Sequence, residues 1–542
     1  MTADLLIRGA TVLDGTGRPG VTADVVVADG RIAAMDPTGQ AVAAGQAATA
    51  RRVVQADGLV LCPGLIDMHA HSDLQILAAP DHTAKVSQGV TTEVLGQDGL
   101  SFAPVDDAVR ARLLDQIAGW NGDSRGVETQ WTTVAGYLDR LDQGIACNAA
   151  YLVPQGTLRL LVMGDEAREA TASELDRMVA LLRQGMVEGA FGMSSGLTYP
   201  PGMFAGTDEL VRLCEVVAER GGYYSPHTRS YGRGALEAYA EMVDVARRSG
   251  CALHLTHATM NFEPNRGRAD ELLALVDRAL DDGVDVTLDT YPYLPGSTTL
   301  SALLPSWALA GGTSALLQRL GDPDTRARIT HELEDVGTDG CHGCPVDWTT
   351  IQVSGVRDPA CSPAVGRTVA ELAQASGRPP AQEYFDLLVA DRAATTILQH
   401  VGDEANVRAI MAHPRHCGGS DAILVGDRPH PRAWGTFPRY LARYVRELGV
   451  LDLAECVHHL TGLPARRLGL VDRGLVREGF AADLVLFDPA TVRDVATFEQ
   501  PRQPAEGIEL VLVNGVAVMD GGNRTSDLPG TALRHFGVTV QR

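Results

Sequence analysis

The feature of this sequence that most constrains its fold is a regular alternation of short apolar strands with helical segments. Eight candidate strands lie at 64–69, 91–96, 149–153, 189–194, 222–227, 252–257, 284–289 and 415–420. The segments between most of them show helical periodicity; after Ala269, for example, Leu272, Leu273, Val276 and Leu280 share one face. Alternating strands and helices form parallel sheets, and eight repeats favour an α/β fold of the (β/α)8 TIM-like barrel type. A doubly wound open sheet is the alternative, but no G-x-G-x-x-G motif follows a strand.

The two ends of the chain have a different pattern, with short strands and tight turns. Asp29-Gly30 and Asp57-Gly58 separate apolar runs near the N-terminus, and Asn514-Gly515 does so near the C-terminus. Such dipeptides are hairpin signals. We therefore predict a small β-sandwich built from both termini, residues 1–61 and 472–542, around a catalytic barrel at 62–471.

The interval at about 298–413 is too long for one connection between barrel strands. It contains two tryptophans, several prolines and the C-x-x-C sequence Cys341-His342-Gly343-Cys344. A long insertion at the catalytic face of a barrel is often a lid, and a purely structural subdomain is the alternative. For the two cysteines, a zinc or redox role is a hypothesis without a second pair nearby to support it.

Charge and cysteine content exclude several classes of function. The net charge of −22 argues against nucleic acid and anionic membrane surfaces as partners. No run approaches the roughly 20 apolar residues of a membrane span, and the N-terminus lacks a signal-like stretch. The nine cysteines have no disulfide-framework spacing, so we expect reduced thiols and a cytoplasmic protein. The sequence does not fix the oligomeric state.

Two histidines directly follow the first barrel strand. His69 and His71 are one residue apart, so along an extended chain their side chains project to the same side. Asp67 and Asp73 flank them. Two imidazoles at a strand end supply half of a metal site.

The ends of other strands supply further donors. These are Asp98 after the second strand, His227 and His257 at the ends of the fifth and sixth, and Asp421 after the eighth. In a barrel, the carboxyl ends of all strands meet at one mouth. His227, His257 and one acidic ligand would make a three-ligand site with an open position for water, as in catalytic zinc sites. Asp421 is then the predicted general base for that metal-bound water, and His254 is excluded because it lies on the opposite strand face.

At this point the sequence resembles a known family, the amidohydrolase superfamily, and within it the N-acyl-D-amino-acid deacylases (D-aminoacylases). The resemblance covers nearly the whole chain. The motifs that carry it are residues 63–71, Gly192 to Gly202, Asp289-Thr290-Tyr291-Pro292-Tyr293, Gly419-Ser420-Asp421, Pro429 to Arg439 and Thr461 to Ala465.

The resemblance implies a barrel plus β-sandwich, one or two Zn²⁺ ions, and hydrolysis of the linear amide of small-molecule N-acyl-D-amino acids. It also implies that Tyr291, Ser297 and Arg432 hold the substrate carboxylate. The planar fork of an arginine suits that task because it can bind a carboxylate bidentately. The predicted metal ligands are His69, His71, Asp98, His227, His257 and Asp421.

The sequence departs from the family pattern at Asp98. D-aminoacylases have a zinc-binding cysteine at this position, which here lies in Gly96-Gln97-Asp98-Gly99. A carboxylate can bind or bridge zinc, but it is a harder ligand than a thiolate.

Two alternatives to a D-aminoacylase-like hydrolase remain. The first is a cyclic-amide hydrolase similar to the dihydropyrimidinases, which place a carbamylated lysine between two metals at a strand end. Lys85 is the only lysine of the chain, and it lies between the first and second strands, where it cannot occupy the fourth. The second is a non-catalytic relative that keeps the barrel and its metal.

Overall fold

The computed structural model describes residues 3–37, 50–122 and 126–535, with eight parallel strands at the centre. The strands are β6 (Leu65–Asp67), β7 (Val90–Leu95), β8 (Asn148–Pro154), β9 (Gly192–Gly196), β10 (Tyr223–His227), β11 (Ala252–Leu255), β12 (Val286–Thr290) and β16 (His416–Gly418). Each overlaps one predicted strand. Their residues are almost entirely buried, as in parallel sheets covered on both faces.

The sheet closes into a barrel where its first and last strands meet. The strand order runs from β16 through β12 to β6 with parallel neighbours throughout. At the seam, the Met68 amide donates to the Gly418 carbonyl (3.1 Å), and the Asp421 amide donates to the His69 carbonyl (2.9 Å). The predicted (β/α)8 barrel is therefore confirmed, and the seam places the segments after β6 and β16 side by side.

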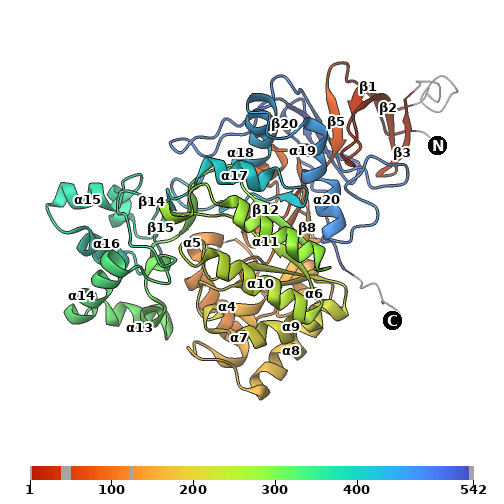
Figure 1. The fold of residues 1–542 in the computed structure, drawn as a ribbon. Helices are drawn as coiled ribbons and strands as arrows, with labels where there is room; N and C mark the ends of the chain where they lie inside the picture. Colours follow the sequence, from red (N-terminus) through yellow and green to blue (C-terminus); the bar gives the residue numbers. More distant parts are fainter. Residues whose placement is uncertain (1–2, 38–49, 123–125, 536–542) are drawn as a thin grey trace.

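Helices pack around the strands (Figure 1). They include α4 (Asp107–Gln116), α6 (Val134–Leu141), α7 (Gln155–Met163), α8 (Ala172–Val187), α9 (Thr207–Glu219), α10 (Ala235–Ser249), α11 (Ala269–Asp281), α17 (Glu404–Met411), α18 (Arg432–Arg439), α19 (Leu453–Leu460) and α20 (Gly462–Arg467). A Thr171–Glu174 capping box begins α8, and α11 buries Leu272 and Val276. No helix in the described part of the chain is long and apolar enough to cross a membrane.

Strands from both termini share one nine-stranded sheet, as the turn pattern predicts. Its members are β1 (Leu5–Val12), β2 (Val21–Ala28), β3 (Arg31–Asp36), β4 (Arg52–Gln55), β5 (Val60–Pro63), β17 (Leu484–Phe487), β18 (Ile508–Val513), β19 (Val516–Asp520) and β20 (Asn523–Arg524). The link between the termini is the antiparallel pairing of β5 with β17. Because β5 leads directly into β6, this sheet holds the start of the first barrel strand. The domain boundaries at 61/62 and 471/472 stay a prediction.

The predicted insertion contains a small antiparallel sheet and a hydrophobic core of its own. The sheet has the order β13 (Gly296–Thr299), β15 (Thr396–Gln399), β14 (Ile351–Gly355). Its helices are α12 (Ser306–Leu309), α13 (Gly312–Arg319), α14 (Pro323–His331), α15 (Val369–Ser376) and α16 (Pro380–Ala390). Leu303, Leu333 and Tyr384 belong to its core. The helices of this subdomain extend away from the barrel in Figure 1, while β14 and β15 lie between them and the barrel.

Candidate metal centre and active site

Two groups of buried donors lie at the carboxyl ends of the barrel strands. His69, His71, Asp98 and Asp421 form the first group. Asp98, His227 and His257 form the second, and the donor atoms within each group lie within 4.8 Å of one another. Every predicted metal ligand is therefore in one of the two groups, and Asp98 is in both.

The distances in the first group are those of donors that face a common centre. The Nε2 atoms of His69 and His71 are 3.3 Å apart. His71 Nε2 lies 3.2 Å from Asp421 Oδ1, and His69 Nε2 lies 3.5 Å from Asp98 Oδ1. The pairing at the barrel seam explains the arrangement, because it brings Asp421 next to the strand that carries the two histidines.

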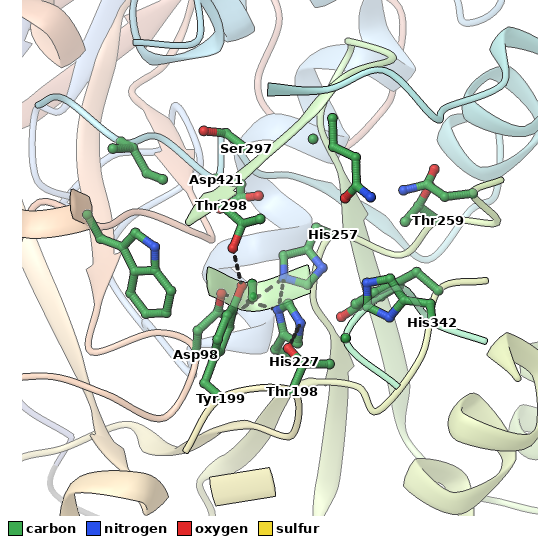
Figure 2. A pocket seen from close by; sticks show the side chains of 18 of the residues that line it. Asp98, Thr198, Tyr199, His227, His257, Thr259, Ser297, Thr298, His342 and Asp421 are labelled. Atoms are coloured by element: carbon green, nitrogen blue, oxygen red, sulfur yellow. Dashed lines mark hydrogen bonds and ion pairs between the residues drawn. The ribbon is translucent and has the colours of Figure 1, made fainter. Parts of the chain in front are cut away.

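The second group is similarly tight (Figure 2). His227 Nδ1 lies 3.1 Å from His257 Nε2 and 3.3 Å from Asp98 Oδ2. The backbone around these donors is unusual, since Asp98, His257 and Asp421 all have positive φ angles (53°, 31° and 47°). Non-glycine residues adopt such angles rarely and at an energetic cost, and they concentrate at functional sites.

The chemistry of these residues fits a metal ion. Asp98 Oδ1 is buried and has no hydrogen-bond partner in the described part of the chain, and neither does His69 Nδ1. A buried carboxylate oxygen without a partner is costly unless a cation or donor satisfies it. Imidazole and carboxylate are also the usual zinc ligands when no thiolate is present. The six residues could hold one ion or two that share Asp98.

The protonation states of Asp98 and His69 suit metal binding, whereas the Asp98 and Asp421 carboxylates overcome the effect of burial and raise the pKa of His71 and His257, whose protons a bound cation would displace. Although burial raises the pKa of Asp98, the His227 and His69 side chains hold it well below its usual range. Burial lowers the pKa of His69 to about 4, with the Asp98 and Asp421 carboxylates opposing that shift. Ionised carboxylates and neutral imidazoles are the forms that coordinate metals.

A buried arginine lies beside the metal-binding groups. Arg432 begins α18, is fully buried, and has its guanidinium carbon 4.4 Å from the centre of the Tyr291 ring. One nitrogen lies 2.8 Å from Asp421 Oδ2. Its Nε and Nη1 have no hydrogen-bond partner among the described residues. Because burying unpaired donors of a charged group is costly, these two nitrogens are suited to an incoming anion.

The cavity at the barrel mouth contains the other two predicted carboxylate-binding residues. Tyr291 and Ser297 line it together with His71, Asp98, His227, His257 and Asp421. Ser297 comes from β13, the first strand of the insertion. The structure thus brings all the predicted site residues to one place; their roles stay proposals.

Lys85 has a structural place that the sequence did not reveal. It lies in α3 (Thr83–Val86), and its Nζ donates to Asp67 Oδ2 (2.5 Å) and Ser420 Oγ (2.9 Å). Ser420 immediately precedes Asp421, and its amide donates to Asp67 Oδ1 (2.9 Å). The lysine therefore supports the seam from behind, with its Nζ held by Asp67 and Ser420, which argues against a carbamylated bridging lysine.

Two other histidine-containing motifs also differ from the metal groups. His254 Nε2 lies 2.9 Å from Asp289 Oδ2, away from the donors, as its exclusion predicted. Asp289 Oδ1 accepts from the His257 amide (2.9 Å), so the His254–Asp289 pair positions a predicted ligand.

Cys341 and Cys344 are free thiols outside both groups. The zinc hypothesis for them gains no support, but His342 between them lines the cavity.

Sequence reasoning missed the rest of the cavity wall. Trp120, Thr259, Asn261, His342, Gln399 and Ile423 line it. Trp120 lies in the short helix α5 (Ala118–Asn121), and the others come from loops or from the insertion. Thr259 and Ile423 each lie two residues after a predicted ligand, His257 and Asp421, which is a signal that could have identified them.

Comparison with known proteins agrees with this geometry. The model of the amidohydrolase family matches residues 52–519. The chain belongs to the amidohydrolase family. A D-aminoacylase of Alcaligenes xylosoxydans xylosoxydans is 36% identical over 98% of this amidohydrolase and 97% of its own length. An N-acyl-D-aspartate deacylase of the same organism is 35% identical over 98% and 95%.

A solved structure extends the comparison to three dimensions. It is the N-acyl-D-glutamate deacylase from Bordetella bronchiseptica, complexed with zinc and a phosphonate inhibitor that mimics the tetrahedral intermediate of the reaction. It has a TM-score of 0.82 and 34% identity, covering 98% of this amidohydrolase and 100% of the other chain. The resemblance predicted from the sequence motifs is thereby confirmed.

Proposed function

We propose that this amidohydrolase is a zinc-dependent enzyme that removes the acyl group from N-acyl-D-amino acids by hydrolysing the amide. One observation carries the proposal: a buried guanidinium with unpaired nitrogens lies beside a His/Asp cluster suited to zinc. An N-acyl amino acid has matching parts, a free carboxylate next to an amide. The relatives support the substrate class, since they are a D-aminoacylase, an N-acyl-D-aspartate deacylase and an N-acyl-D-glutamate deacylase.

Zinc would be held by His69, His71, Asp98, His227, His257 and Asp421 as one or two ions. When bound, zinc polarises a carbonyl oxygen and lowers the pKa of water to about 7. Asp98 belongs to both donor groups, so it would be the ligand common to both ions if two are bound. A cytoplasmic location and a small-molecule substrate complete the proposal.

The protein's own residues orient the substrate and move the proton. Arg432 would bind the substrate carboxylate with Tyr291 and Ser297, fixing the amide over the cluster. Burial raises the pKa of Asp421, but the Arg432 charge and His71 hold it below its usual range. Asp421 is therefore ionised at neutral pH, which is the form that can accept a proton from the attacking water and return it to the leaving nitrogen.

A hydrolysis screen tests this function directly. N-acetyl-D- and N-acetyl-L-amino acids would be compared on one sample whose zinc content is measured. We expect turnover of D substrates only. A zinc-loaded protein without turnover on any amide would favour the non-catalytic alternative, and turnover of cyclic amides alone would favour the dihydropyrimidinase-like one.

We expect Arg432→Lys to impair substrate binding. A bidentate fork becomes a point charge, with a loss on the order of 1.5–3 kcal/mol for a charged hydrogen bond. In kcat/KM for N-acyl-D-amino acids this corresponds to about 10- to 150-fold. Arg467, whose side chain is also largely buried but binds Asp285 outside the cavity, offers the matched control Arg467→Lys. An unchanged kcat/KM in Arg432→Lys would remove Arg432 from carboxylate binding.

We also expect the insertion to become more protected when substrate binds. Ser297 of β13 and Gln399 of β15 line the cavity, so a ligand held by Ser297 contacts the inserted sheet directly. Hydrogen exchange with and without a substrate analogue would measure this, with the remote strands β1 and β2 as the internal control. Equal protection of the insertion in both states would identify it as a static subdomain.

A further inference from the structure

The cavity has two walls of different chemistry on either side of the metal-binding groups. Trp120 and Tyr199, whose rings lie 4.6 Å apart, form the centre of the apolar wall, and Ile423 also lines the cavity. Thr259, Asn261, His342 and Gln399 contribute to the polar wall. In Figure 2, Thr259 and His342 lie on the opposite side of His257 from Tyr199.

The polar wall carries no positive charge. In residues 3–37, 50–122 and 126–535, no lysine or arginine side chain lines the cavity, and its acidic residues are Asp98 and Asp421. The buried Arg432 guanidinium lies beside Asp421, and the substrate's α-carboxylate would occupy it under the proposed function. A second carboxylate in the cavity would therefore have no lysine or arginine side chain to pair with.

His342 gives this wall a neutral hydrogen-bonding group. Its ring centre lies 5.5 Å from those of Tyr231 and Phe262, and its carbonyl accepts from the Arg233 amide (2.9 Å), which fixes the insertion to the barrel. Its Nδ1 is shielded from solvent and has no hydrogen-bond partner in the described segments. Burial, with His227 and His257 nearby, lowers the pKa of His342 to about 3, so the imidazole is neutral.

The two walls differ in which part of the substrate they suit. The acyl chain is a hydrocarbon, and it matches the wall formed by Trp120 and Tyr199. The amino-acid side chain is then left to the wall of Thr259, Asn261 and His342. There Thr259 Oγ1 donates to Asn261 Oδ1 (2.6 Å), and both residues are half-buried.

We propose that this amidohydrolase selects N-acyl-D-amino acids with uncharged side chains and excludes aspartate and glutamate, and that His342 is a specificity-determining residue which hydrogen-bonds polar side chains. The inference rests on the proposed function and deepens it. Relatives of nearly equal identity carry names that differ in substrate, so overall similarity does not decide the question. The charged groups that line the cavity decide whether an acidic side chain is accepted, and no lysine or arginine side chain is among them in the described part of the chain.

An isosteric substrate pair tests the exclusion. N-acetyl-D-glutamine and N-acetyl-D-glutamate have the same shape and differ in charge. We expect kcat/KM to be at least about 100-fold higher for the glutamine substrate, since a desolvated unpaired carboxylate is strongly disfavoured. Values within tenfold of each other would overturn the inference while leaving the proposed function intact. Failure to hydrolyse any D substrate would instead overturn the proposed function.

A charge introduced into the polar wall should change the preference. In Asn261→Lys, an ammonium faces the side-chain position, and we expect the glutamate-to-glutamine ratio of kcat/KM to rise at least about tenfold by charge pairing. Asn261→Met has a similar length without the charge and should leave the ratio unchanged. An equal ratio in both variants would place the side chain elsewhere. If Asn261→Lys does not fold, the substrate pair on the unmodified enzyme still decides.

His342→Asn tests the histidine separately. His342 has a φ of 55°, an angle that asparagine tolerates, so the backbone is kept while the ring is lost. We expect kcat/KM for N-acetyl-D-glutamine to fall about three- to tenfold more than that for N-acetyl-D-leucine, with unchanged zinc content. An equal fall for both substrates would indicate a merely structural role for His342.

Discussion

Asp421→Asn is expected to retain zinc and the folded barrel but to lose a factor of about 10²–10⁴ in kcat, the usual contribution of base catalysis. The amide cannot accept the proton of the attacking water. The fold should survive because the amide oxygen can still face Arg432, whose nitrogen lies 2.8 Å from Asp421 Oδ2. The other five proposed ligands remain to hold the metal.

The measurements are single-turnover kinetics, zinc content and circular dichroism on one preparation. Asp277→Asn is the matched control, because Asp277 lies on α11 and its carboxylate contacts His413 near the surface. It should leave kcat unchanged. Activity of Asp421→Asn within a few-fold of the unmodified enzyme would show that another group is the base.

The site was predictable from the sequence to the extent that strand ends defined it. His227 ends β10, and His69, Asp98, His257 and Asp421 each come within three residues of the end of a strand. Parallel strands of a barrel present these positions at one edge, so a correct strand prediction also locates the donors. Two of the positive φ angles lie near glycines in the sequence, since Asp98 directly precedes Gly99 and Asp421 comes two residues after Gly419, as in tight turns.

The other features of the site depend on contacts between residues that are far apart in the sequence, and a local sequence pattern does not encode such contacts. Lys85 pairs with Asp67, 18 residues away, and with Ser420, 335 residues away. The sequence showed only that this lysine cannot occupy the fourth strand, which argued against a cyclic-amide hydrolase, whereas its burial behind the barrel seam shows that it is structural. The position of His342 was also not predictable from the sequence. A role for the flanking cysteines was considered, whereas the histidine between them lines the cavity. Its position depends on how an insertion of more than 100 residues packs on the barrel.

The largest effect on the metal is expected at Asp98, the residue shared by the two donor groups. Asp98→Ala should lower bound zinc and abolish turnover together, because the second group loses its only carboxylate and the first group keeps only that of Asp421. Alanine is strained at the φ of 53° found here, so it tests geometry as well as ligation. Asp98→Asn is the better matched variant, since asparagine tolerates this angle and removes only the charge. It should also lose zinc.

Asp98→Cys should behave differently from both. It introduces a thiolate, a softer ligand that zinc binds well and that the D-aminoacylase resemblance implies at this position. We expect zinc to be retained while kcat changes, because the thiolate alters the charge distribution around the metal. Zinc content and kcat should be measured in parallel on the three variants. The two measurements distinguish an effect on zinc binding from an effect on the rate of hydrolysis.

The competing interpretation is that Asp98 only stabilises a glycine-rich turn by bonding to backbone. Against it, Asp98 lies 3.3 Å from His227 Nδ1, and its Oδ1 has no hydrogen-bond partner in the described part of the chain. A turn residue would use those oxygens on nearby amides. Full zinc occupancy in Asp98→Asn would nevertheless establish the turn interpretation, and the exchange of sulfur for oxygen at this centre would then be wrong.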